Sequence, residues 1–239
     1  MKNITVIGSG IIGLTTAIKL EREGYNVRII TRNLHFKTTS AVAAAIWMPF
    51  KAAPVELVNQ WSLETYEVFR QQSLDPITGI SMVDFIYLSQ EDNVPEWEKA
   101  APPGSLRKAT KSELPPSYSF AYIAHVPLIE TPIYLDFLFD EFRGEIVLDE
   151  ILNFEEIERP DSWIINCTGL GSRVLAKDTL LYPIKGQIVK MEASDNIICA
   201  VDDHPDRFFY IIPRRDCIVL GGSSVAHDYS SDPGHYWIS

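Results

Sequence analysis

The feature that most constrains the fold of this chain is an apolar strand that runs directly into a glycine-rich turn. Residues 4–7 are followed by three glycines in the spacing G-x-G-x-x-G, and residues 11–22 have the periodicity of an amphipathic helix. Gly8 permits a sharp turn, Gly10 a close approach of the backbone to phosphates, and Gly13 close helix–strand packing. The order predicts a dinucleotide pyrophosphate on the helix N-terminus, in preference to a βαβ unit that binds no nucleotide.

Length and composition exclude several classes of protein. The 239 residues are 46% hydrophobic and 22% charged, which is typical of one large or two modest globular domains. A net charge of −11 repels phosphate backbones, so nucleic acid is not an expected partner. No apolar run reaches the ~20 residues of a membrane span, and the N-terminus has no signal-peptide pattern. Three widely spaced cysteines favour reduced thiols without a metal site, and we expect a cytoplasmic protein.

The remaining pattern predicts a discontinuous α/β architecture. A helical pattern covers residues 54–72, a strand pattern follows at 80–90, and a second helix is expected from Thr131. An apolar strand at 163–167 is typical of a parallel sheet, whereas the short strands after it indicate an antiparallel meander. We therefore predict a Rossmann-like nucleotide domain and a second domain with a mixed, mainly antiparallel sheet. The predicted division is 1–50 with 140–182, and 51–139 with 183–239.

Five stretches in the same order resemble the D-amino acid oxidase family of FAD-dependent enzymes. They are VIGSGIIGLTTA (6–17), TTSAVAAAIWMPF (38–50), IINCTGLG (164–171), PIKGQIVKM (183–191) and YIIPR with IVLGGSS (210–224). The resemblance covers nearly the whole chain and is far more specific than the glycine motif alone.

The resemblance implies an activity and its partners. The family has a Rossmann-like FAD domain and a substrate domain, and it oxidises D-amino acids by hydride transfer from the α-carbon to flavin N5. Oxygen then reoxidises the flavin and gives hydrogen peroxide, and the imino acid hydrolyses to a keto acid and ammonia. Such chemistry depends on positioning the substrate over the cofactor. FAD, a D-amino acid and oxygen are therefore the expected partners, and a homo-oligomer is possible.

The resemblance also implies a set of cofactor-binding residues. Thr38, Thr39 and Ser40 would reach the phosphate and ribityl side of the flavin, whereas Ala44, Ala45 and Ile46 would bring backbone N–H groups to its ring. Ile151 would lie against the adenine, and Thr168 would close the site. The full expected set is Gly8, Ser9, Gly10, Ile11, Ile12, Gly13, Arg32, Asn33, Thr38, Thr39, Ser40, Ala44, Ala45, Ile46, Ile151 and Thr168.

Four residues are implied at the substrate. Tyr210 would hydrogen-bond the substrate carboxylate, although a strand tyrosine with a surface hydroxyl is the alternative. Met48 and Phe50 would line the substrate pocket, or else belong to the core. An acidic substrate would need an extra cation, which Arg207 or Arg214 could supply, but the apolar lining favours a neutral substrate.

The end of the second strand departs from the usual dinucleotide pattern. An acidic residue on the adenosine ribose is expected there, but the sequence has Thr31, Arg32 and Asn33. An arginine at this place is also typical of NADP enzymes. An NADP-dependent reductase is therefore an alternative.

Two further departures concern the substrate clamp. The lid segment before Tyr210 is short, which predicts a more open pocket. In the family, a C-terminal region supplies an arginine that pairs bidentately with the substrate carboxylate. This sequence has no arginine after Arg215, so we expect a chain that lacks the C-terminal third of the family. Arg207, Arg214 or Arg215 could replace the missing arginine, and a non-catalytic flavin-binding fragment is the second alternative.

Overall fold

The structure, a computed structural model, describes residues 2–204 and 207–232. The chain divides into two compact units. The first comprises Met1–Ala43 and Thr131–Pro183, and the second comprises Ala44–Glu130 and Ile184–Ser239.

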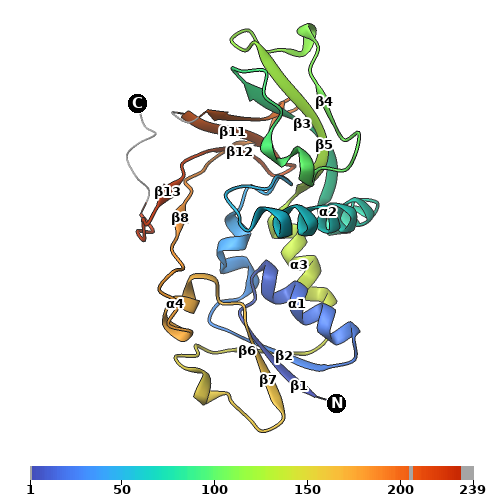
Figure 1. Cartoon of the computed structure of the whole chain (residues 1–239). Helices are drawn as coiled ribbons and strands as arrows, with labels where there is room; N and C mark the ends of the chain where they lie inside the picture. The colour runs from blue at the N-terminus through green and yellow to red at the C-terminus, as the bar shows by residue number, and fades with distance from the viewer. Residues whose placement is uncertain (1, 205–206, 233–239) are drawn as a thin grey trace. The chain divides into compact units, whose positions relative to one another are not determined.

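Unit 1 is built on a parallel four-stranded sheet in the order β6-β2-β1-β7. Figure 1 shows that segments far apart in the sequence, drawn in blue and yellow, combine in this sheet. Helices α1 and α3 pack against each other. The elements are β1 (Asn3–Ile7), α1 (Ile11–Arg22), β2 (Asn26–Thr31), α3 (Thr131–Glu141), β6 (Glu145–Leu148), β7 (Ser162–Asn166) and α4 (Ser172–Leu175).

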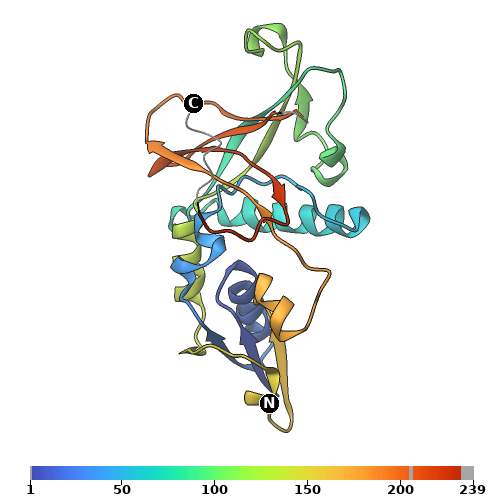
Figure 2. The ribbon, with the colours of Figure 1, turned by 90° about the vertical axis from the view of Figure 1, so that its left-hand side faces the viewer.

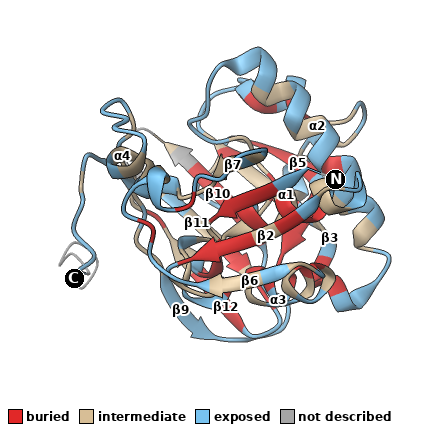
Figure 3. Cartoon of the chain, turned by 90° about the horizontal axis from the view of Figure 1, so that it is seen from below, coloured by how far each residue is buried: buried red, intermediate tan, exposed pale blue. Residues whose placement is uncertain are grey.

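The central strands of unit 1 are almost completely buried, as Figure 3 shows for β2. Four consecutive residues of β1 are buried, which is the continuous apolar run expected of a parallel strand covered on both faces. Helix α1 buries Leu14, Ala17 and Ile18, which lie three and four residues apart on one helix face. Burial of these side chains fixes the glycine turn between β1 and α1.

Unit 2 contains a mixed seven-stranded sheet in the order β4-β5-β3-β10-β11-β12-β9. All its pairs are antiparallel except β3 with β10. Helix α2 (Val55–Gln72, cyan in Figure 2) packs against β3 and β5. The strands are β3 (Ile80–Ser89), β4 (Leu106–Lys108), β5 (Phe120–Ile129), β9 (Val189–Glu192), β10 (Cys199–His204), β11 (Arg207–Pro213) and β12 (Cys217–Gly221), and a separate ribbon pairs β8 (Ile184–Lys185) with β13 (Val225–Ala226).

The core of unit 2 is rich in aromatic residues. Trp47, Phe85 and Trp97 are buried among small and β-branched side chains of β5, β10 and β12. Trp47 meets Trp97 edge-on, with ring centroids 6.4 Å apart, and the indole N–H of Trp47 donates to the Ser62 carbonyl of α2. These contacts anchor α2 on the sheet.

The predicted α/β fold class with mixed sheets is confirmed, but the two units divide at other residues than predicted. Residues 44–50 belong to unit 2, because the Ile129 N–H donates to the Ala45 carbonyl and Ile46 forms a β-bridge with Leu128. Residues 131–139 belong to unit 1, where the Thr131 hydroxyl donates to the carbonyls of residues 41 and 43. Neither set of contacts is visible as a sequence pattern. Of the helices that the structure describes, none has the length and apolar character needed to cross a bilayer.

Candidate functional site

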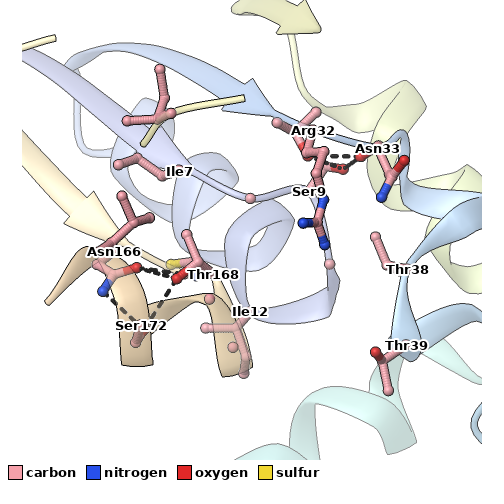
Figure 4. Close-up of a pocket in the computed structure, with 18 of the residues that line it drawn as sticks. Ile7, Ser9, Ile12, Arg32, Asn33, Thr38, Thr39, Asn166, Thr168 and Ser172 are labelled. Carbon is pink, nitrogen blue, oxygen red and sulfur yellow. Dashed lines mark hydrogen bonds between the residues drawn. The ribbon is translucent and has the colours of Figure 1, made fainter. Parts of the chain in front are cut away.

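A cavity of about 670 Å³ lies in unit 1, at the carboxyl ends of β1, β2, β6 and β7. Figure 4 shows Arg32 and Asn33 on one side of the glycine turn and Asn166, Thr168 and Ser172 on the other. The order β6-β2-β1-β7 reproduces the 3-2-1-4 arrangement of a doubly wound sheet, with the chain leaving for unit 2 between its second and third members. Ligands of such sheets bind outside the carboxyl ends of the strands.

The glycine turn has no room for side chains. Gly8 has a φ of +107°, and a Cβ there would lie 2.5 Å from the Cys167 carbonyl oxygen. A Cβ on Gly13 would overlap the Gly8 carbonyl oxygen. These two glycines are therefore required by the fold, while Gly10 leaves the backbone bare at the helix start.

The N-terminus of α1 faces the cavity. Gly10 is the N-cap residue and offers no side chain to the first turn, so only Ser40 caps it: the Ile11 N–H donates to Ser40 Oγ at 3.1 Å. The other first-turn N–H groups have no intrahelical acceptor. Ile12 also lines the cavity, and its side chain is 63% exposed. A negatively charged group is the natural acceptor at this helix end.

Hydrogen bonds tie the segment after β2 to the glycine turn. Ser9 is buried, and its hydroxyl donates to the Asn33 carbonyl at 2.8 Å and lies 3.1 Å from the Thr31 hydroxyl. The Thr38 hydroxyl donates to the His35 carbonyl. Ser9 therefore stabilises the turn and also lines the cavity, and its expected role at the cofactor stays a prediction. Thr38, Thr39 and Ser40 all line the cavity.

A polar cluster closes the other side of the cavity at the end of β7. The Asn166 side-chain oxygen accepts hydrogen bonds from the backbone N–H and the hydroxyl of Thr168, at 3.2 and 2.7 Å. The Asn166 amide donates to Ser172 Oγ at 2.9 Å. Asn166 and Ser172 were not among the expected site residues, although a polar residue at the end of an apolar strand is a usable signal.

The opposite edge of the cavity carries charges from two neighbouring strands. Arg32 and Asn33 follow β2, while Asp149, Glu150 and Ile151 follow β6. Ile151 is 9% exposed and packs in the small core of unit 1, where it still lines the cavity. The acidic pair was also missed by sequence reasoning.

Ala44, Ala45 and Ile46 are absent from this cavity. They lie in unit 2, where Ala44 and Ile46 pack on the core and Ala45 adopts a φ of +53° while bonded to β5. The structure thus does not bring them together with the other expected cofactor residues inside one unit. Their expected role toward the flavin ring stays a prediction.

Two of the expected substrate residues, Met48 and Tyr210, pack against the core of unit 2, whereas Phe50 is exposed. Met48 packs on the aromatic core, and the ring of Phe50 stacks on Phe208 at 5.0 Å. Phe208 in turn meets Tyr210 edge-on at 5.6 Å. Phe50 also lines a second cavity, of about 860 Å³.

The hydroxyl of Tyr210 has no hydrogen-bond partner among the residues that the structure describes. Burial raises the pKa of Tyr210 above its usual value, since the charged form is poorly solvated there. The hydroxyl is therefore a neutral donor that is available to a ligand.

Two of the three arginines considered for the clamp have partners inside the chain. Arg214 is buried and pairs with both carboxylate oxygens of Asp216 at 2.8 and 2.7 Å. Arg215 pairs with the buried Glu130 at 2.6 Å. Arg207 begins β11, but its side chain lies outside what the structure describes.

Comparison with known proteins identifies the family. Residues 3–236 match the model of the DAO family, described as FAD dependent oxidoreductase. The chain belongs to this family. It is 36% identical to the D-amino-acid oxidase of Rubrobacter xylanophilus over 95% of this chain and 71% of that protein. It is also 36% identical to the D-amino-acid oxidase of Dictyostelium discoideum, over 97% of this chain and 68% of that protein.

Solved structures agree on the fold. L-proline dehydrogenase from P. horikoshii superposes with a TM-score of 0.74 at 15% identity, over 98% of this chain and 73% of that one. Glycine oxidase from Bacillus cereus gives 0.73 at 16% identity, over 98% of this chain and 74% of that one. The protein is therefore an FAD-dependent oxidoreductase of the DAO type, and FAD is its cofactor. The NADP-dependent alternative is set aside.

Proposed function

We propose that this oxidoreductase converts D-amino acids into imino acids, which hydrolyse to keto acids and ammonia while oxygen is reduced to hydrogen peroxide. The observation that carries the proposal is the 36% identity to two proteins named D-amino-acid oxidase over almost the whole chain. Bound FAD supplies a hydride acceptor for the substrate α-carbon. The tasks left to the protein are to bind, orient and shield the reactants.

Unit 1 is the proposed FAD-binding domain, and its cavity is the proposed place of the adenosine and pyrophosphate. The glycine turn supports this placement, because side chains at Gly8 and Gly13 are sterically forbidden and the N–H groups of α1 face open space. Ser40, already bonded to the Ile11 N–H, would hold the helix end in place. Thr38 and Thr39 would complete the phosphate side, and Ile151 would contact the adenine.

Unit 2 is the proposed substrate domain, with Tyr210 as the donor to the substrate carboxylate. Its unpartnered hydroxyl and its pKa, which burial raises above the usual value, support this role, because both favour a protonated hydroxyl that can donate to a carboxylate. Phe208 meets Tyr210 edge-on and stacks on Phe50, and these apolar rings favour a neutral substrate.

Anaerobic reduction of the bound flavin by a panel of D- and L-amino acids tests the reaction. We expect bleaching with neutral D-amino acids and none with their L-enantiomers. Yellow protein that no amino acid bleaches would instead identify a non-catalytic flavin-binding fragment and overturn the proposed reaction.

Replacement of Tyr210 by Phe tests the carboxylate contact. We expect Tyr210→Phe to weaken binding of a carboxylate inhibitor such as benzoate by about tenfold, the scale of a hydrogen bond to a charged group. Its free energy of unfolding should stay within about 0.5 kcal/mol of wild type, because the hydroxyl has no partner to lose. Tyr25→Phe, in unit 1, is the matched control. If wild type, Tyr210→Phe and Tyr25→Phe bind the inhibitor equally well, Tyr210 does not contact the substrate carboxylate.

A further inference from the structure

The end of β2 lacks the carboxylate that usually binds the adenosine ribose of a dinucleotide. In dinucleotide-binding folds an acidic residue at this place accepts a hydrogen bond from a ribose hydroxyl, because a carboxylate is a pure acceptor and the hydroxyl needs one. Here Arg32 follows directly after β2. A guanidinium has donors only, so it cannot perform that task.

The neighbouring strand supplies a carboxylate at the same edge. Strand β6 pairs with β2 in parallel, and Leu148 lies opposite Thr31 at the last position of both strands. The residues that follow, Asp149 and Glu150, therefore emerge beside Arg32. Both are part of the cavity wall, together with Arg32 itself.

Local hydrogen bonds hold this acidic segment in place. The Asp149 N–H donates to the Thr31 carbonyl at 3.0 Å, which extends the β2–β6 pairing by one step. The Asp149 carboxylate accepts from the Glu150 N–H at 2.8 Å through Oδ1, which holds this carboxylate against the backbone of the turn. Of the two carboxylates, the one of Glu150 is paired with Arg32 and is therefore the better placed to replace the acid that β2 lacks.

Glu150 also makes an ion pair that orients it. Arg32 Nη1 lies 3.2 Å from Glu150 Oε1. The pair is joined by this one contact and is not bidentate. Glu150 Oε2 therefore keeps its acceptor capacity. The side chains are 69% and 55% exposed, so both remain accessible from the cavity.

We propose that Glu150 accepts the ribose hydroxyl of FAD, in the place of the acid that β2 lacks, and that Arg32 positions the Glu150 carboxylate. The assignment rests on the placement of the adenosine half of FAD in the unit 1 cavity. It also accounts for Arg32 in an FAD enzyme: its charge is balanced by Glu150, and the added carboxylate repels a 2′-phosphate.

Displacement of FAD from the FAD-loaded protein tests the proposal without turnover. ADP and 2′-deoxy-ADP are titrated against the holoprotein, and recovery of flavin fluorescence reports the displaced FAD. In wild type we expect ADP to compete about fivefold better than 2′-deoxy-ADP, because only ADP has the hydroxyl that Glu150 accepts. In Glu150→Gln we expect the two nucleotides to compete almost equally. Glu155→Gln, an exposed acid outside the cavity wall, should keep the wild-type ratio.

The remaining outcomes separate the parts of the argument. If Glu150→Gln weakens both nucleotides equally and keeps the ratio, Glu150 is only structural and the proposal is overturned. If Arg32→Met removes the preference for ADP while Glu150→Gln keeps it, Arg32 is the ribose ligand and the assignment is wrong. If neither nucleotide displaces FAD from wild type, the placement of the adenosine half fails together with the proposal. None of these results tests the proposed oxidation of D-amino acids, which the anaerobic reduction of the flavin tests separately.

Discussion

Two glycines of the neighbouring chain segment determine where the Tyr210 ring can lie. Gly221 pairs with Tyr210 across β11 and β12, and a Cβ at Gly221 would overlap the ring and hydroxyl of the tyrosine. A Cβ at Gly222 would lie 2.6 Å from the same ring and 3.1 Å from Phe208. The glycines thus allow the ring to lie flat against the backbone, which leaves its hydroxyl clear of protein partners.

Gly221→Ala should therefore disturb both stability and the proposed carboxylate contact. We expect a loss of ~1–3 kcal/mol in the free energy of unfolding, because the methyl group overpacks a filled site. Benzoate binding should weaken at least as much as in Tyr210→Phe, since the whole ring must move. Gly186→Ala is the control, because a Cβ there would come no closer than 3.7 Å to another atom. Urea unfolding that does not distinguish the two variants would contradict this account.

At the scale of elements, the short 3-10 helix Lys111–Glu113 is closed by a capping box. The Glu113 carboxylate accepts from the Thr110 N–H at 2.8 Å and from Arg107 at 3.0 and 2.7 Å, and this arginine belongs to β4. These hydrogen bonds, the one from Arg107 first, lower the pKa of Glu113 from 4.5 to about 2. The box thus joins the 3-10 helix to the edge strand of the unit 2 sheet.

The lowered pKa predicts a pH-dependent contribution of Glu113 to stability. Because the folded state holds the ionised form, the contribution is present above pH 4.5 and is lost as the pH falls toward about 2. Glu113→Gln should thus be less stable than wild type at neutral pH, and the difference should shrink between pH 4.5 and 2. The free energy of unfolding at several pH values measures this. Glu192→Gln, an exposed acid on β9, should show no such trend.

At the scale of the whole molecule, the expected FAD contacts are concentrated in unit 1. The cavity is lined by residues of Ile7–Ser40 and Asp149–Leu181 only, and both ranges belong to that unit. A ligand that binds the folded state alone stabilises it by mass action, by ~2.7 kcal/mol at a hundred times its Kd.

Amide hydrogen exchange with and without FAD should show this distribution. We expect FAD to slow exchange at the glycine turn and the start of α1, and to leave the edge strands β4 and β9 of unit 2 unchanged. Gly13→Ala is the control, because its methyl group would overlap the Gly8 carbonyl oxygen and distort the glycine turn. In this variant we expect FAD not to slow amide exchange at the turn. Uniform protection of both units would contradict a cofactor held mainly by unit 1.

Much of the fold could be predicted because it is encoded locally. The β1 strand, the glycine turn and α1 follow one another within twenty residues, and Gly8 and Gly13 are required by backbone geometry at single positions. Helix α2 at Val55–Gln72 likewise follows from the spacing of its apolar residues. Gly8, Gly10 and residues 38–40, which the sequence predicts at the phosphates, line one cavity, and their role there stays a prediction.

Only the tertiary structure shows which unit some residues belong to, because this depends on contacts between segments that are far apart in the sequence. Residues 44–47 pair with β5, and Ala44, Ala45 and Ile46 therefore belong to unit 2. Helix α3 packs on α1, and residues 131–139 therefore belong to unit 1. The ion pair of Arg32 with Glu150 joins residues 118 positions apart. By itself the sequence determined the strand, the glycine turn and the first helix, and it predicted a dinucleotide at the start of that helix, because turns and periodicity are local. Which carboxylate stands beside Arg32 is set by the parallel register of β2 and β6, a long-range pairing that no local pattern records.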